Sequence, residues 1–277
     1  MTTSRVNQVL RIAILSILVF LLVLIPLWMV IVNSFKTQTE AAALGVGLPT
    51  RWAAIDNYVQ VFQNSNYARS FLNSLLVTGV SAGLLLAIAA PAAWAFARSG
   101  SRALRVLYVA CLVGVLLPLP VVPLVFMLRE AGLQGTQVGL VVFTVAARVS
   151  LVVFLLTGFA RGLPTELEEA ASVDGATRLR TFLSVVVPLM TPVLFATFVV
   201  IAVSVWNDFY GPLFLISDPD QATLPLGLYR LSSGIREATA WNFVFAHVVL
   251  VSLPLILVYV FAQRRIVEGV TAGALKS

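Results

Sequence analysis

The sequence contains very few of the side chains on which disulfides, metal sites and many active sites depend. Among its 277 residues there is one cysteine, Cys111, and one histidine, His247. A single cysteine excludes an intrachain disulfide, and one histidine with one distant cysteine gives no cluster of metal ligands. We therefore expect Cys111 to be a small apolar residue, and a metal site or an enzyme built on His and Cys chemistry is disfavoured.

Lysine is almost as scarce, which bears on any use of ATP. The two lysines are Lys36 and Lys276, and Lys276 is preceded by Leu275, where a phosphate-binding P-loop requires glycine. The chain has no loop that would cradle the phosphates of a nucleotide. If ATP drives its function, another subunit must hydrolyse it, and this chain is not itself an enzyme.

Charge of either sign is also scarce. Only 11% of the residues are charged and 60% are hydrophobic, and the mean hydropathy is +0.98. A soluble globular domain of this length does not have such a composition. The chain is therefore predicted to be an integral membrane protein, with lipid as its main surroundings.

Six apolar runs are long enough to cross a membrane, since a helix needs about 20 mainly apolar residues to do so. They lack the period-two alternation of strands, and backbone groups in lipid must be satisfied within the segment. We predict an all-α membrane protein that forms one transmembrane domain over residues 1–277. Its six transmembrane helices are expected at about 12–34, 71–97, 106–128, 138–160, 183–206 and 240–263.

The distribution of basic residues predicts the orientation of these spans. Eleven Lys and Arg lie in 55 residues on one side (1–11, 98–105, 161–182 and 264–277), against six in 82 residues on the other (33–69, 129–137 and 207–242). Because basic residues concentrate in cytoplasmic loops, both termini are expected to be cytoplasmic. The net charge of +6 then reflects topology, and no nucleic-acid partner is inferred.

All 12 Asp and Glu lie outside the apolar runs. A carrier driven by protons or sodium usually needs an ionisable group within the membrane. Secondary active transport is therefore disfavoured, although an ATP-independent carrier or channel for small polar solutes stays as the alternative function.

The segment 161–182 is a charged insert between two apolar runs. Its acidic residues suit the start of a helix, Gly175 can end that helix in a left-handed conformation, and Asp174 can cap a second helix that begins near Ala176 and continues into the fifth span. A slim, alanine-rich hairpin of this kind can enter a groove on a partner protein. Its key residues are Glu168, Glu169, Ala170, Ala171, Asp174, Gly175, Ala176, Arg178 and Arg180.

This insert resembles the coupling loop of ABC importer permeases, in which Glu-Ala-Ala is followed a few residues later by glycine. The resemblance extends along nearly the whole chain and is closest to the carbohydrate-uptake branch with its maltose-type subunits. The other matching segments are Asn57-Tyr58, Phe71-Leu72-Asn73-Ser74, Pro188 with Pro192, Trp206-Asn207-Asp208-Phe209, residues 223–228 and the tail 263–276.

The resemblance implies a type I importer permease fold and a set of partners. These are a homologous second permease, two ATPase subunits that carry ATP and magnesium, and an extracytoplasmic solute-binding protein, all at the inner or cytoplasmic membrane. No cofactor is expected on this chain. The coupling loop would dock in a cleft of one ATPase subunit. The tail 263–276 would also contact the ATPase pair, through Gln263, Arg264, Glu268, Gly269, Gly273 and Lys276.

Four polar residues within or beside the spans have two possible roles. Arg148 lies in the fourth span, where a lone cation is costly and must face protein or water. It could pair with the second permease or line the pathway, unless the span itself is misplaced. Asn73, Asn207 and His247 could line the pathway or form interhelical hydrogen bonds.

The segment between the fifth and sixth spans carries charges where a binding protein would land. Asp218, Asp220, Arg230 and Arg236 could guide that encounter, or they could belong to a solvated loop. Sugars and oligosaccharides are the leading substrate class by resemblance, with polyols and glycerol phosphates left open.

Overall fold

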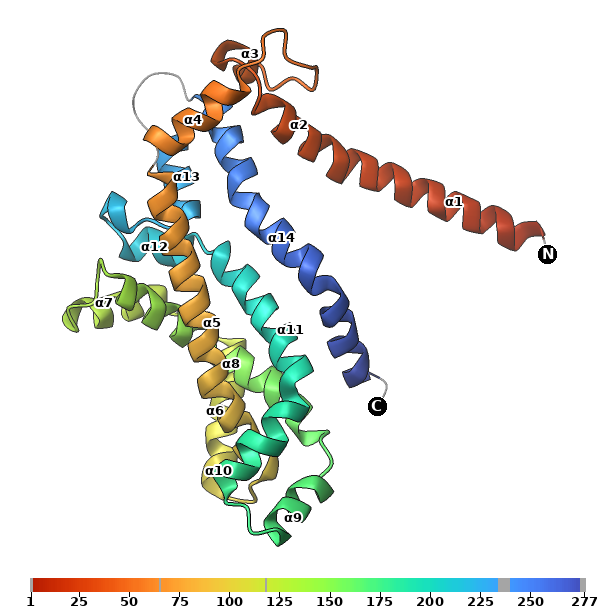
Figure 1. The fold of residues 1–277 in the computed structure, drawn as a ribbon, viewed down its shortest axis with the longest axis vertical. Coiled ribbons are helices and arrows are strands. Elements are labelled where there is room, and N and C mark those ends of the chain that lie inside the picture. The colour runs from red at the N-terminus through yellow and green to blue at the C-terminus, as the bar shows by residue number, and fades with distance from the viewer. Residues whose placement is uncertain (1, 65, 118, 234–239, 275–277) are drawn as a thin grey trace. The chain divides into compact units, whose positions relative to one another are not determined.

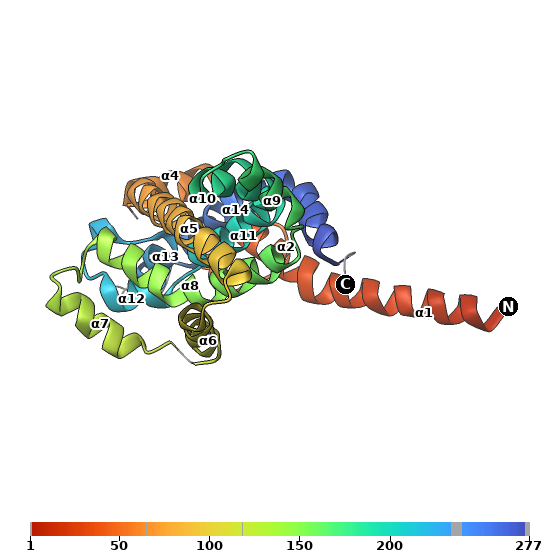
Figure 2. The same ribbon diagram turned by 90° about the horizontal axis from the view of Figure 1, so that it is seen from below.

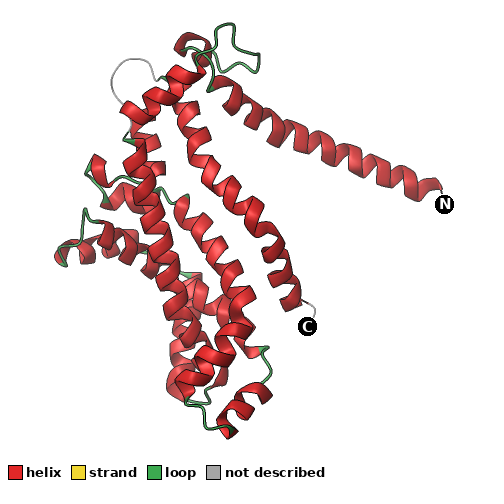
Figure 3. Cartoon of the chain, in the orientation of Figure 1, coloured by secondary structure: helices red, strands yellow, loops and turns green. Residues whose placement is uncertain are grey.

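The computed structural model describes residues 2–64, 66–117, 119–233 and 240–274. Within these ranges every regular element is helical, and Figure 3 draws no strand. This confirms the predicted all-α fold. It also agrees with the composition, because a helix satisfies its backbone hydrogen bonds inside a single segment in lipid.

Five helical stretches in the described residues are long and apolar enough to cross a membrane. They are Leu10–Asn33, Tyr67–Arg98, Gln137–Arg161, Arg178–Trp206 and Trp241–Gln263. A sixth span exists only if the helix pair Arg102–Leu116 and Val121–Glu130, bent by 114°, is taken as one broken span.

The sequence predicted one straight span at 106–128, and the structure differs there. Helix α6 (Arg102–Leu116) ends before Leu117, whose ψ of 140° is extended, and α7 (Val121–Glu130) begins after Pro120. Pro118 follows Leu117 in the sequence, and a residue that precedes proline is pushed out of the helical conformation. Two prolines in three residues therefore interrupt an otherwise continuous apolar run.

The described chain divides into two compact units. Unit 1 comprises Met1–Ala68 and Leu226–Pro254, and unit 2 comprises Arg69–Pro225 and Leu255–Ser277. Unit 1 holds α1 (Thr2–Val19), η1 (Phe20–Leu24), α2 (Ile25–Asn33), α3 (Gln38–Ala42), α4 (Ala54–Asn64), most of α13 (Leu224–Ser232) and the first part of α14 (Trp241–Ala274). In Figure 1, α1 runs through η1 into α2 as one long helix.

A buried amide network organises the polar part of unit 1. The Asn57 Nδ2 donates to the carbonyl oxygens of Ser34 and Lys36, both at 2.9 Å. Its Oδ1 accepts a hydrogen bond from Asn242 Nδ2 at 2.8 Å. Asn57 and Asn242 are both buried, so one side chain on α4 connects the loop after α2 to the second residue of α14.

Unit 2 contains α5 (Tyr67–Arg98) from Arg69 onward, α6, α7, α8 (Gln137–Arg161), α9 (Glu166–Val173), α10 (Arg178–Thr181), η2 (Phe182–Val186), α11 (Val187–Trp206), α12 (Tyr210–Leu215) and η3 (Pro219–Gln221). Helix α8 packs against α6, α11 and α12. On α5 the fully buried residues are small or aliphatic and recur at helical spacing, as Ala82, Leu85, Ala89 and Ala93. Small side chains at such positions let membrane helices approach closely.

Two π-helical turns have the same cause. Each lies directly before a proline, η1 before Pro26 and η2 before Pro188. Proline has no N–H to donate to the preceding turn, so the helix widens locally where that bond is missing. The helix Arg178–Trp206 nevertheless continues through η2 as one candidate span.

Candidate functional site

The charged insert forms a helical hairpin, residues 166–181, whose turn is closed by main-chain hydrogen bonds. The Ala176 N–H donates to the Ala171 carbonyl oxygen at 2.9 Å, and the Gly175 N–H donates to the Ser172 carbonyl oxygen at 3.1 Å. Gly175 has φ +76°. This pair of bonds around a left-handed residue is the Schellman motif, and it confirms that Gly175 ends α9 in the left-handed conformation.

The second helix of the hairpin starts differently from the prediction. It begins at Arg178, and its N-cap is Thr177, whose hydroxyl accepts the Arg180 N–H at 3.3 Å. The expectation that Asp174 caps this helix near Ala176 is wrong, because Asp174 is the last residue before the glycine turn and belongs to the end of α9. Figures 1 and 2 show α9 and α10 at the end of unit 2 where α11 begins.

The outer side of the hairpin is open to its surroundings. Glu169 and Ala170 are exposed, and so are the apolar side chains Leu167, Val173 and Leu179. Val173, at the tip, is 88% exposed. The charged residues Glu169, Asp174, Arg178 and Arg180 of the hairpin are exposed as well, and their predicted role in docking stays a prediction.

Glu168 has a different position from its neighbour Glu169. Its Oε1 accepts a hydrogen bond from Arg98 Nε at 2.9 Å and forms an ion pair with Arg98 Nη2 at 2.8 Å, and its Oε2 accepts a hydrogen bond from Trp94 Nε1 at 2.9 Å. The side chains of Arg98 and Glu168 are only 20% and 14% exposed. Sequence reasoning missed Arg98 and Trp94, although an arginine in the last turn of a long span is a recognisable signal.

Arg148 has its partner within the same chain. Its Nη2 lies 2.9 Å from Asp208 Oδ2, and its Nε lies 3.4 Å from Ser204 Oγ. The Asp208 Oδ1 also accepts the Gly211 N–H at 3.2 Å. The fourth span therefore contains Arg148 as predicted, and the acid just beyond the fifth span neutralises it; a pathway or subunit-interface role stays a prediction.

Asn73 and Asp220 hold a loop of unit 2 against α5. Asn73 Nδ2 donates to the carbonyl oxygens of Asp220 at 2.9 Å and Ala222 at 3.0 Å. The Asp220 carboxylate pairs with Arg69 at 2.7 Å, and the Asp218 side chain accepts the Asp220 N–H at 2.9 Å. Asn73 thus has a structural task here, while the two acids stay partly accessible for the predicted docking.

The other predicted polar residues are not part of the hairpin. His247 is fully buried in unit 1 and its ring packs edge-on against Tyr67, with centroids 5.4 Å apart. Asn207 is exposed and donates to the Val203 carbonyl oxygen of its own helix at 2.9 Å. Arg230 is half-buried on α13, and Arg236 lies outside the described residues.

The predicted tail continues a helix. Helix α14 extends without a break to Ala274, so Arg264, Glu268, Gly269 and Gly273 are helical. Gln263 is exposed, and its Nε2 donates to the Val260 carbonyl oxygen at 3.2 Å. Lys276 lies outside the described residues, and contact of this segment with an ATPase stays a prediction.

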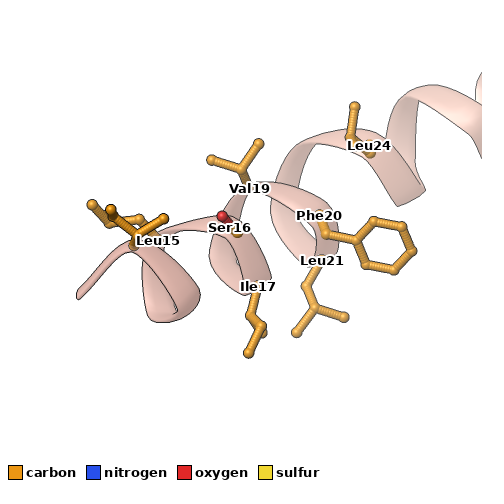
Figure 4. A pocket seen from close by; sticks show the side chains of 8 residues that line it. Leu15, Ser16, Ile17, Val19, Phe20, Leu21 and Leu24 are labelled. Atoms are coloured by element: carbon orange, nitrogen blue, oxygen red, sulfur yellow. The ribbon is translucent and has the colours of Figure 1, made fainter. Parts of the chain in front are cut away.

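The surface of the first span contains a wide hollow of about 680 Å³ that is not a polar site. Every residue that lines it comes from α1 and η1, and Ser16 is the one polar member among eight (Figure 4). A hollow along a single apolar helix offers no converging hydrogen-bonding groups, so it does not fit a binding site for a polar solute.

Several apolar spans, with a charged and exposed hairpin between two of them, define a multi-pass membrane protein. The chain belongs to the family of binding-protein-dependent transport system inner membrane components, whose model matches residues 79–272. This confirms the resemblance to ABC importer permeases.

Relatives of known name agree with this family. The chain is 32% identical over 264 residues to the diacetylchitobiose uptake system permease protein of Streptomyces coelicolor, covering 95% of this chain and 87% of that protein. It is 27% identical to the melibiose/raffinose/stachyose import permease protein of Bacillus subtilis, with full coverage of both.

A solved structure shares the fold. A chain of a bacterial ABC transporter involved in the import of the acidic polysaccharide alginate superimposes with a TM-score of 0.86 at 20% identity, covering 95% of this chain and 98% of the other. The match confirms the importer permease fold that the sequence predicted.

Proposed function

We propose that this chain is the membrane-spanning permease subunit of an ABC importer that moves a sugar or oligosaccharide inward. The family is binding-protein-dependent, and the named cargo of its relatives is carbohydrate: diacetylchitobiose in one case, melibiose, raffinose and stachyose in another. In this proposal a solute-binding protein delivers the solute, and ATP and magnesium act on two separate ATPase subunits.

The hairpin is the observation that supports this function. Its outer face is exposed and apolar at the tip, while α10, η2 and α11 run together as the span Arg178–Trp206. A partner that binds α9 therefore binds an element that is connected to a membrane helix. The connection is a turn closed by main-chain hydrogen bonds. Movement of the ATPase subunits can be transmitted into the membrane along this route, as alternating access requires.

A homologous second permease completes the proposed assembly. The most apolar 18-residue stretch of the span Leu10–Asn33 has a mean hydropathy of 3.0, and none of its residues is buried. Such a helix needs lipid or another apolar subunit around it, and a second permease supplies that surface. With the basic segments on the cytoplasmic side, both termini and the hairpin face the ATPase subunits.

Substitution at Gly175 tests the proposed docking. A side chain at φ +76° costs about 1–2 kcal/mol in backbone strain, whereas nothing lies within 4 Å of the added Cβ. Gly175→Val should therefore deform the hairpin turn without a clash. We expect copurification of the ATPase subunits, binding-protein-stimulated ATP hydrolysis and solute uptake to fall together.

Gly47→Val is the matched control, because Gly47 is exposed, has open space around its Cβ and is not part of the hairpin. It should leave all three measurements near the wild-type level. Normal assembly and uptake in Gly175→Val would exclude the docking role. If the wild-type chain transports solute with no ATPase subunit attached, the alternative of an ATP-independent carrier is correct.

A further inference from the structure

We propose that Arg98, Glu168 and Trp94 form a latch that connects the hairpin to α5, so that force applied to α9 reaches more than one span. This inference rests on the proposed importer function. It assigns a positioning role to two residues of α5 that lie outside the coupling-loop sequence, and it separates the tasks of the neighbouring acids Glu168 and Glu169.

The geometry of the latch is that of a strong, shielded ion pair. Glu168 accepts one hydrogen bond from Arg98 and one from Trp94, both at 2.9 Å, and its Oε1 lies 2.8 Å from Arg98 Nη2 in an ion pair. Charge-assisted hydrogen bonds of this kind are roughly twice as strong as neutral ones. Because both charged side chains are largely shielded from solvent, water cannot replace a lost partner easily.

The latch touches segments that lead into three spans. Arg98 Nη2 also donates to the Leu163 carbonyl oxygen at 2.8 Å, just after α8 ends. The Trp94 ring lies 5.4 Å from the ring of Phe182, the first residue of the π-turn that leads into α11. Trp94 and Arg98, one helical turn apart on α5, therefore connect α5 with the end of α8, with α9 and with the base of α11.

Glu168 and Glu169 therefore have different roles in this proposal. Glu168 is turned inward and is engaged by α5, while Glu169 is exposed on the hairpin. Loss of Glu169 should weaken the contact with the ATPase. Loss of Glu168 should leave that contact in place and weaken the transmission of movement to the spans.

The test uses the complete importer in proteoliposomes, with its ATPase subunits and binding protein, and measures solute imported per ATP hydrolysed. Glu168→Gln and Arg98→Gln should lower this ratio about fivefold or more, the lower end of usual coupling factors, while the ATPase still copurifies. Glu166→Gln on α9 and Arg102→Gln on α6 are the controls, since both residues are exposed and lie outside the latch.

The charge-exchanged double variant Arg98→Glu with Glu168→Arg separates pairing from mere loss of charge. We expect it to recover a substantial part of the ratio. Trp94→Phe keeps a ring beside Phe182 and removes one donor, so it should give a smaller loss and serves if the charge variants fold poorly.

Three outcomes decide the latch. Unchanged solute per ATP in both single variants overturns it, and so does equal loss in the Glu166→Gln control. A ratio that falls in the single variants and recovers in the exchanged pair supports it. The proposed function fails separately, if no ATPase subunit copurifies with the wild-type chain at all.

Discussion

Amide side chains hold polar segments together in both described units, as Asn57 does in unit 1 and Asn73 in unit 2, but unit 2 adds three ion pairs to them. In unit 1 the amide of Asn57 bonds to two main-chain carbonyl oxygens and to a second amide, and the buried Lys36 amine donates to Asn33 and to the Gly45 carbonyl oxygen. In unit 2 three ion pairs, centred on Arg69, Arg98 and Arg148, connect segments far apart in sequence.

Hydrogen bonds between an amide and main-chain oxygens hold a segment in one position, whereas ion pairs between side chains allow it to move. An amide that bonds to main-chain oxygens depends on the local fold, and its strength hardly changes with salt. An ion pair between two side chains can part and re-form, and its strength depends on burial and on the surrounding charges. The hairpin is attached to α5 by an ion pair between two side chains. Such a contact suits the movement that the hairpin transmits in the proposed importer.

The Arg148 pair should give the largest effect on stability. Arg148→Leu leaves Asp208 with a poorly solvated charge, since both side chains are about 85% shielded, and should cost about 3 kcal/mol. The loss of stability is measured in detergent, as the temperature at which half of the monodisperse protein is lost. Arg129→Leu, at an exposed arginine that ends α7, should change little.

Neutralising both partners of that pair sharpens the test. Arg148→Leu with Asp208→Asn removes the stranded charge and should recover part of the loss. If the double variant is as unstable as the sum of the two single variants, the pair is not coupled and the structural assignment of Arg148 is wrong.

Asn57→Leu should have an intermediate effect. It leaves the carbonyl oxygens of Ser34 and Lys36 and the amide of Asn242 without this partner, at a cost of about 2 kcal/mol. The same thermal assay applies, with Asn207→Leu as control because Asn207 bonds only within its own helix turn. The loss should be the same at low and high salt; a strong salt dependence would contradict the comparison between the units.

Arg69→Gln should have the smallest effect. The side chains of Arg69 and Asp220 are 57% and 45% exposed, and such pairs contribute below about 1 kcal/mol. Any loss of stability at low salt should disappear at about 1 M salt, where charges are screened within about 3 Å. A loss as large as that of Arg148→Leu would show that burial does not rank these ion pairs.

The sequence predicted the features that depend on local patterns. Apolar runs gave five of the spans to within a few residues, and the glycine after an acidic helix start gave the turn at Gly175. Two local signals were read wrongly: the prolines near 118–120, which break the third run, and Thr177, which caps α10 in place of Asp174.

Long-range pairing could not be predicted in this way. Arg98 and Glu168 are 70 residues apart, and Arg148 and Asp208 are 60 apart. No periodicity in the sequence connects them, and only the packing of the spans decides which acid meets which base. None of the acids lies within an apolar run, but Asp208, two residues beyond the end of the fifth span, is close enough to pair with Arg148.

The turn at Gly175 has a consequence for how this subunit can vary. Because the reversal is closed by main-chain hydrogen bonds, it requires one residue without a side chain, and it uses no side chain of the neighbouring surface residues Glu169, Ala170 and Val173. In the proposed importer, those side chains can change to fit a different ATPase partner while the shape of the hairpin is kept. Gly175 thereby fixes the shape of the hairpin, while the surface side chains determine which partner it fits.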